Sequence, residues 1–242
     1  FKLLQDLPNT VTMPLSVCYR CDASIIKMAQ TIVPHIECRE GAPAGTVDHK
    51  AELSMVAPAG TVDHKAELSM VADGDMILCR LTAPLVDVCL RYIQQGIKAY
   101  VKGGDIGAGL IRLIEGFDKF SRVDDVMDQL EYKLYSLSVD YAKDNKCTMQ
   151  EAQESSQYVN LYDRVQAIRF MADGLDHSYQ IISRIKSIFS DCQQGICLST
   201  IHKSKGLECS SCCMLCTENL CHERSMEMEW AAEEEKKLVK VT

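Results

Sequence analysis

The sequence predicts an α/β fold in which a parallel sheet is interrupted by an all-helical insertion. A strand–helix–strand pattern occupies residues 75–101, which is short enough for one βαβ unit with parallel strands and a right-handed crossover. Residues 106–190 then show only helical periodicity, and apolar strand patterns return after them. We therefore expect a parent α/β domain at 1–105 and 191–242 that carries a helical accessory insertion at 106–190.

Two features precede the βαβ unit. A helix is predicted from residue 22, where Asp22 is a typical N-cap and Pro34 is expected to end the helix. The segment 42–56 then recurs without change at 57–71. Two copies are too few for a solenoid, so we interpret the repeat as a duplication inside a tolerant surface loop.

The predicted βαβ unit begins with a short apolar strand near 75–80. Thr82 is the expected cap of the helix that follows, and Gly96 is its expected C-terminal glycine. The second strand spans 97–101 and is broken by the two glycines that come after it.

Amphipathic periodicity defines the predicted insertion, and two strands follow it. The tail has the pattern of an acidic helix that runs into a short apolar segment. The predicted segments are helices at 106–117, 126–144, 149–173 and 178–189, strands at 196–201 and 209–216, and a terminal helix at 227–241.

Composition excludes several classes of protein. The chain has 242 residues, which suits one or two domains, and its net charge of −8 argues against non-specific coating of DNA. It contains no apolar run of 18 residues and no signal-peptide pattern, so we expect no membrane contact and an intracellular location, cytoplasmic or nuclear. The 13 cysteines are an odd number, so we interpret them as reduced thiols that serve mostly as small apolar core residues.

Two segments carry side chains suited to nucleotide or nucleic-acid chemistry. In LSVCYRCDASII, 15–26, Tyr19 offers a face for base stacking and Arg20 a fork for phosphate, just before a helix. In LSTIHKSKGLE, 198–208, an apolar strand runs into a basic turn that contains a glycine. Four side chains of this segment have the chemistry to hold a nucleic-acid backbone: Thr200, His202, Lys203 and Lys205.

Taken in order, these segments resemble the UvrD/Rep-type superfamily 1 DNA helicases. LSVCYRCDASII resembles motif IV of that family, and GDMILCRLTAPLVDVCLRYIQQGIKAYVKGGDIG, 74–107, is similar to the segment that follows it. STIHKSKGLE resembles motif V, which the family writes Thr-x-His-x-x-Lys-Gly-Leu-Glu. WAAEEEKKLVKVT, 230–242, is similar to the run into motif VI.

The resemblance implies the second RecA-like motor domain of an ATP-dependent helicase, with the helical block as its accessory insertion. It implies that Tyr19 stacks on the adenine of ATP and that Arg20 is a catalytic arginine finger on the γ-phosphate. Gly206 and Glu208 would contact the phosphate and ribose side of the nucleotide. At the motif V positions, Thr200 and His202 would contact the backbone of single-stranded DNA.

The chain also departs from the family pattern. It contains no Walker A sequence and no Walker B acidic strand, which the family places in the first motor domain. That N-terminal RecA-like domain is therefore the expected partner that holds most of ATP and Mg²⁺. Cys21 stands where the family has serine, and the motif VI arginine would follow Thr242. We expect that this chain alone neither hydrolyses ATP nor unwinds DNA.

Two alternatives from other classes remain open. The first is a zinc module built from two C-x-x-C pairs, although we expect no metal site because the pairs lie far apart in sequence. Its candidate ligands are Cys18, Cys21, Cys209, Cys212, Cys213, Cys216, Cys221 and His222. The second is a non-catalytic relic of a helicase that binds a partner through the tyrosines and methionines of 127–171, side chains whose spacing is more typical of a core.

Overall fold

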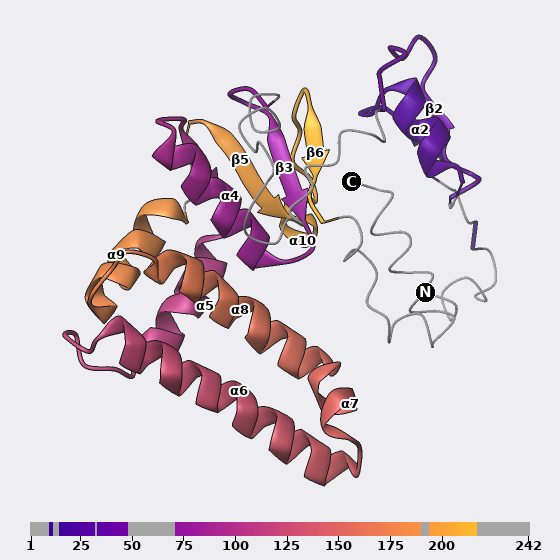
Figure 1. The fold of residues 1–242 in the computed structure, drawn as a ribbon. Coiled ribbons are helices and arrows are strands. Elements are labelled where there is room, and N and C mark those ends of the chain that lie inside the picture. The colour runs from indigo at the N-terminus through magenta and orange to yellow at the C-terminus, as the bar shows by residue number, and fades with distance from the viewer. Residues whose placement is uncertain (1–9, 12–14, 32, 48–70, 190–193, 217–242) are drawn as a thin grey trace, which may run out of the picture.

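The computed structural model describes residues 10–11, 15–31, 33–47, 71–189 and 194–216, and the architecture is mixed α/β (Figure 1). The described chain contains a four-stranded sheet, a separate two-stranded sheet and a block of helices (Figure 1). All strand pairs within the two sheets are parallel. The predicted α/β class and its interruption by helices are therefore confirmed.

The four-stranded sheet has the order β4-β5-β3-β6. Its strands are β3 (Met76–Cys79), β4 (Ala99–Val101), β5 (Ile196–Thr200) and β6 (Cys212–Met214). Each lies within a segment predicted to be a strand. The helix α4 (Thr82–Gln94) connects β3 to β4, but these strands are not neighbours because β5 pairs with both of them. After the helices that follow β4, the chain therefore re-enters the sheet as β5, between β4 and β3.

Local sequence explains how α4 ends. Gly96 has φ of +78°, a conformation that glycine adopts without steric cost. The N–H of Gly96 donates to the carbonyl of Ile93 at 3.0 Å, and the N–H of Ile97 donates to the carbonyl of Tyr92 at 2.9 Å. These two bonds form a Schellman motif, so the predicted role of Gly96 is confirmed.

The start of α4 differs from the prediction. Thr82 is the first helical residue rather than the cap, and no side chain of the N-cap position bonds to the helix. The carboxylate of Asp163, from the helical insertion, accepts hydrogen bonds from the N–H of Thr82 at 2.9 and 3.0 Å and from the N–H of Ala83 at 2.8 Å. A distant residue therefore caps this helix, which short-range sequence rules do not reveal.

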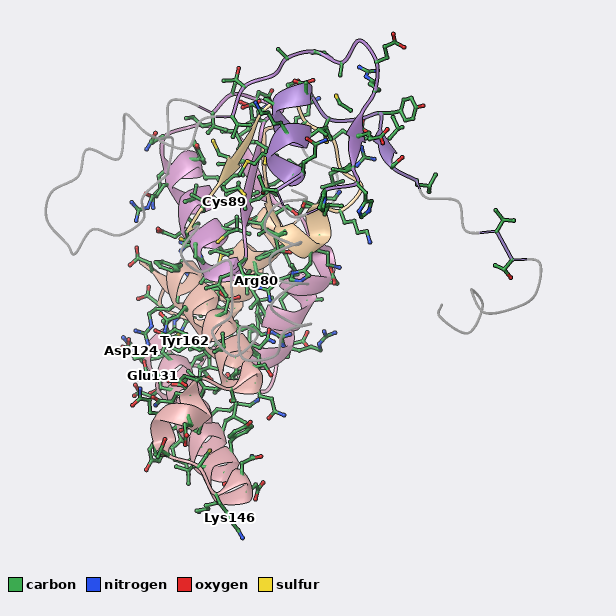
Figure 2. The ribbon with its side chains drawn as sticks, turned by 90° about the vertical axis from the view of Figure 1, so that its right-hand side faces the viewer. Arg80, Cys89, Asp124, Glu131, Lys146 and Tyr162 are labelled. Atoms are coloured by element: carbon green, nitrogen blue, oxygen red, sulfur yellow. The ribbon has the colours of Figure 1, made fainter. Side chains whose placement is uncertain are left out.

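The helical insertion comprises α5 (Gly104–Ile114), α6 (Val123–Asn145), α7 (Met149–Gln153), α8 (Ser156–Ala172) and α9 (Ser178–Ile188). The single helix predicted at 149–173 is wrong, because Ser155 interrupts it. Its Oγ accepts from the N–H of Tyr158 at 3.3 Å and donates to the carbonyl of Ala152 at 2.6 Å, which ends one helix and caps the next. Lys146 lies at the end of this block farthest from the sheet (Figure 2).

The sheet and the insertion share one hydrophobic core. Alternate strand residues such as Ile77 and Leu198 join buried side chains of α4, α5, α6, α8 and α9. The opposite face of the sheet carries a smaller cluster in which Met76 and Leu78 pack with Ile201. An ion pair between Glu131 of α6 and Arg169 of α8 links the two longest helices of the described chain.

The N-terminal unit forms its own small sheet. Strands β1 (Val17–Cys18) and β2 (Glu37–Cys38) pair with each other, and α2 (Ala23–Ala29) connects them. Asp22 occupies the predicted N-cap position, although its side chain makes no capping hydrogen bond. The helix ends at Ala29, earlier than the predicted limit at Pro34.

Both ends of the repeated segment are fixed to the fold. The carbonyls of Pro43 and Ala44, at the start of the first copy, accept from the N–H groups of Ala23 and Ser24 at 2.9 Å each. Val71, the last residue of the second copy, belongs to the main core. Residues 48–70 lie outside the described part of the chain, as does the helix predicted at 227–241.

The cysteines are less buried than expected. All 11 cysteines of the described residues are free thiols in this structure, and the reduced state of the protein stays a prediction. Only Cys79, Cys89 and Cys197 are buried, so the expectation of mostly core cysteines is wrong. Within the described ranges, no helix has both the length and the apolar character needed to span a membrane.

Replacing Asp163 tests the long-range cap. We expect Asp163→Ala to lower the free energy of unfolding by about 1–2 kcal/mol, because it leaves the N–H groups of Thr82 and Ala83 without their acceptor. Asp163→Asn keeps an oxygen acceptor and should lose less. Urea denaturation measures both variants, with Asn160→Ala on the same helix as the matched control. Equal stability of the Asp163→Ala and control variants would contradict the capping role.

The same carboxyl group predicts a pH dependence. Burial raises the pKa of Asp163, although the N–H groups of Ala83 and Thr82 act in the opposite direction. The folded chain therefore binds this proton more tightly than the unfolded chain, in which an aspartate has an ordinary pKa of about 3.9. The stability of the wild type relative to Asp163→Asn should be largest below that pH and decrease as pH rises through the raised pKa.

Deleting one copy of the repeat tests its anchoring. Removal of either copy produces the same sequence, which keeps both the Pro43–Ala44 carbonyls and a valine before Ala72. Because loop closure changes by only about 0.6 kcal/mol for each doubling of length, we expect stability within about 1 kcal/mol of the full chain. Thermal unfolding and near-ultraviolet circular dichroism measure the result. Loss of cooperative unfolding would show that the second copy is structurally required.

Candidate nucleotide and nucleic-acid site

The carboxyl ends of the parallel strands bring several polar segments to one edge of the sheet. Arg80 follows β3, residues 102–105 follow β4, and residues 201–208 follow β5. The chain leaves β3 toward β4 and leaves β5 toward β6, so the two connections run in opposite directions across the sheet. α4 packs on one face, whereas Ile201 packs on the other. Such a switch of direction creates a crevice where ligands of open α/β sheets commonly bind.

A contact between Arg80 and His202 joins the segments that follow β3 and β5. The Nη1 atom of Arg80 lies 3.1 Å from Nε2 of His202. Since a guanidinium can only donate, Nε2 must be the acceptor, and the imidazole in this contact is neutral with its proton on Nδ1. Figure 2 shows Arg80 close to the region where the sheet meets the helices. Protonation of His202 would break the contact and leave two cations side by side.

A second contact joins the β5 and β4 segments. The Nζ atom of Lys203 lies 2.6 Å from Oδ2 of Asp105, which is in the first turn of α5. The hydrogen bond from Lys203 holds the pKa of Asp105 below its ordinary value. Both side chains are largely exposed, so the pair contributes little to stability, and an external anion can compete for the lysine.

Arg20 and Glu208 are adjacent although they are far apart in sequence. The Nε atom of Arg20 lies 2.9 Å from Oε1 of Glu208, and both side chains are more than half exposed. This ion pair joins the bend after β1 to the segment after β5. Tyr19, beside Arg20, is 73% exposed and available for stacking. Two motifs predicted from separate parts of the sequence therefore meet in the structure.

The remaining predicted residues occupy a short turn. β5 leads directly into α10 (Ile201–Ser204), and Thr200 at this junction is buried, whereas His202, Lys203 and Lys205 are exposed. Gly206 has φ of +88°, which favours glycine, and a Cβ there would meet no atom within 4 Å. The turn thus presents three of the four predicted nucleic-acid residues to solvent. The role of Thr200 stays a prediction.

Sequence reasoning missed Arg80 and Asp105 as members of this site. Each follows a strand of the sheet directly or within a few residues. The signal was therefore available, because carboxyl ends of parallel strands meet at one edge. No local pattern, however, indicated which basic side chain Asp105 would meet.

The zinc alternative gains no support from the described residues. They contain no group of three or more cysteine, histidine, aspartate or glutamate side chains placed to hold a metal ion. Cys18 contacts Cys21, and Cys209 contacts Cys212, but only as separate pairs. Cys221 and His222 lie outside the described part, together with the segment that resembles the run into motif VI.

The partner-binding alternative has a mixed outcome. Among the side chains of 127–171, Met171 is fully buried, as expected for a core position. Tyr132, Tyr135 and Tyr162 are instead 72%, 62% and 47% exposed. The helical block therefore carries exposed tyrosines, and partner binding through them stays a prediction.

Comparison with known proteins adds no further assignment. No family model, curated protein or solved structure matches this chain.

Proposed function

We propose that this chain is the second, RecA-like motor region of an ATP-dependent DNA helicase or translocase of the UvrD/Rep type. In this proposal residues 106–190 are the accessory insertion of that motor. The observation that carries the proposal is the ion pair of Arg20 with Glu208. It joins the motif IV-like and motif V-like segments at the sheet edge, where a nucleotide bound between two motor domains would need them.

The exposure of this pair suits exchange with a nucleotide. An exposed ion pair contributes only about 0–1 kcal/mol, so a triphosphate with several negative charges can displace Glu208 from the guanidinium. Arg20 would then act as the arginine finger that stabilises charge on the γ-phosphate. Tyr19 would stack on adenine, while Glu208 and the Gly206 turn would face the ribose and phosphates.

The same turn offers a route from nucleotide to DNA. His202, Lys203 and Lys205 precede Glu208 by only a few residues, and they are exposed. A change in the Arg20–Glu208 contact therefore acts on a segment that also carries the proposed contacts to the DNA backbone. This arrangement would couple the nucleotide state to the grip on single-stranded DNA.

In this proposal, ATP hydrolysis requires chemical groups that this chain does not supply. The sequence has no Walker A loop, and the described residues contain no cluster suited to a metal ion. ATP and Mg²⁺ would be held mainly by a separate RecA-like domain. We expect no ATP hydrolysis by the purified chain, with or without DNA.

Binding of single-stranded DNA tests the proposal. We expect the chain to bind a labelled oligothymidylate, with Lys205→Ala and Lys203→Ala each weakening binding about three- to tenfold and reducing the salt dependence by about 0.7 per lost phosphate contact. Asp105→Asn removes the carboxylate that engages Lys203 and should strengthen binding. Fluorescence anisotropy at several salt concentrations measures these effects.

The matched control is Lys186→Ala, which removes an exposed lysine of α9 outside the sheet edge. It should bind as the wild type does. If Lys186→Ala and Lys205→Ala weaken binding equally, the interaction is a general charge effect rather than a site. Absence of binding at low salt contradicts the DNA role directly.

A further inference from the structure

A pair of cysteines brackets the Tyr19–Arg20 dipeptide. Cys18 ends β1, and Cys21 follows the bend that carries Tyr19 and Arg20. The two thiols are free and partly buried, and their side chains hydrogen-bond each other. The fold therefore holds two sulfur atoms in contact on either side of the proposed catalytic arginine.

We propose that Cys18 and Cys21 form a reversible intramolecular disulfide through exchange with a low-molecular-weight disulfide such as oxidised glutathione. The thiolate of Cys18 attacks one sulfur of the oxidant, which gives a mixed disulfide and releases one glutathione thiolate. Cys21 then loses its proton and attacks the Cys18 sulfur, which releases the second glutathione thiolate. Both cysteines are oxidised and one glutathione disulfide is reduced to two thiols, so atoms and electrons balance.

The pKa values of the two thiols differ in the direction that this order of reaction steps requires. Burial acts to raise the pKa of Cys18. Hydrogen bonds from the backbone N–H groups of Cys21 and Arg20 act in the opposite direction, as do the Cys21 side chain and the charge of Arg20. The net result is a pKa of Cys18 below its ordinary value. Burial, followed by the hydrogen bond and charge of Cys18, raises the pKa of Cys21 to about 11. Cys18 is therefore the attacking thiol, and Cys21 is the resolving thiol.

Formation of the mixed disulfide also prepares the second step. Once Cys18 is bonded to glutathione, it no longer carries a negative charge beside Cys21. The charge and the hydrogen bond that raise the pKa of Cys21 are then removed, which makes its deprotonation easier. The geometry thus favours ring closure after the first exchange rather than before it.

Other cysteines are less suited to the same reaction. Cys38 is the register partner of Cys18 across the two-stranded sheet, so it lies on the neighbouring strand as a competitor. Cys209 and Cys212 contact each other, but burial raises the pKa of each of them. Cys79 contacts Cys216, and Cys79 is fully buried, which hinders attack by a dissolved disulfide.

Trypsin mapping of the full chain tests the proposal. The chain is equilibrated with a series of reduced and oxidised glutathione mixtures, free thiols are alkylated in acid-quenched samples, and the digest is analysed by mass spectrometry. Trypsin cleaves after Arg20, Lys27 and Arg39, so Cys18, Cys21 and Cys38 fall in the separate peptides 3–20, 21–27 and 28–39. We expect peptides 3–20 and 21–27 to appear as a linked pair that separates on reduction.

Variants define the order of the steps. In Cys21→Ser, Cys18 should accumulate as the glutathione adduct, whereas in Cys18→Ser the modification of Cys21 should be at least about tenfold slower than that of Cys18 in the first variant. Cys38→Ser is the matched control and should leave the 3–20/21–27 link unchanged. A link between 3–20 and 28–39, initial adducts on Cys21, or oxidation of Cys209 and Cys212 while Cys18 and Cys21 stay reduced would each overturn the proposal. These readouts involve no DNA and no ATP, so they are independent of the proposed function.

Discussion

The carboxylate of Asp163 is the interaction on which the arrangement of the sheet and the insertion depends. It accepts the first N–H groups of α4 while belonging to α8, so it fixes the helical block to the helix that crosses the sheet. Burial makes this charge costly, and the two backbone donors offset only part of that cost, because the pKa of Asp163 stays raised. Because α4 begins directly after β3, the same carboxylate also determines where the segment containing Arg80 emerges at the sheet edge.

Parallel pairing converts this fixed frame into a site. The ends of β3, β4 and β5 lie together, and two contacts connect the segments that leave them: Arg80 with His202 and Lys203 with Asp105. A third contact, Arg20 with Glu208, ties the bend after β1 to the segment after β5. Each pair is exposed enough to exchange a partner for a phosphate. The edge therefore combines a rigid support with contacts that have small individual energies, as the proposed motor function would require.

Much of this fold could be predicted from short-range patterns. Apolar runs identified every strand of the main sheet, and Gly96 identified the end of α4, because both signals depend on nearby residues. The cap by Asp163 and the position of β5 between β3 and β4 depend on residues far away in sequence, so periodicity could not show them. The break at Ser155 was missed because the helical pattern continues on both sides of it. For the site, the motif-like segments indicated Arg20 and Glu208. Arg80 and Asp105 could have been indicated by their positions after strands, but their partners His202 and Lys203 are known only from the structure.

The central position of β5 also has a consequence for the order of folding. β3 and β4 are made early in the chain, yet neither can complete its pairing until β5 arrives after the whole helical insertion. Local helices form faster than contacts between distant strands, so closure of the sheet should be the slow step. Until then the two early strands leave unpaired backbone edges that can pair with other chains. A shortened chain that ends before β5 would therefore retain an open gap in its sheet and a strong tendency to aggregate.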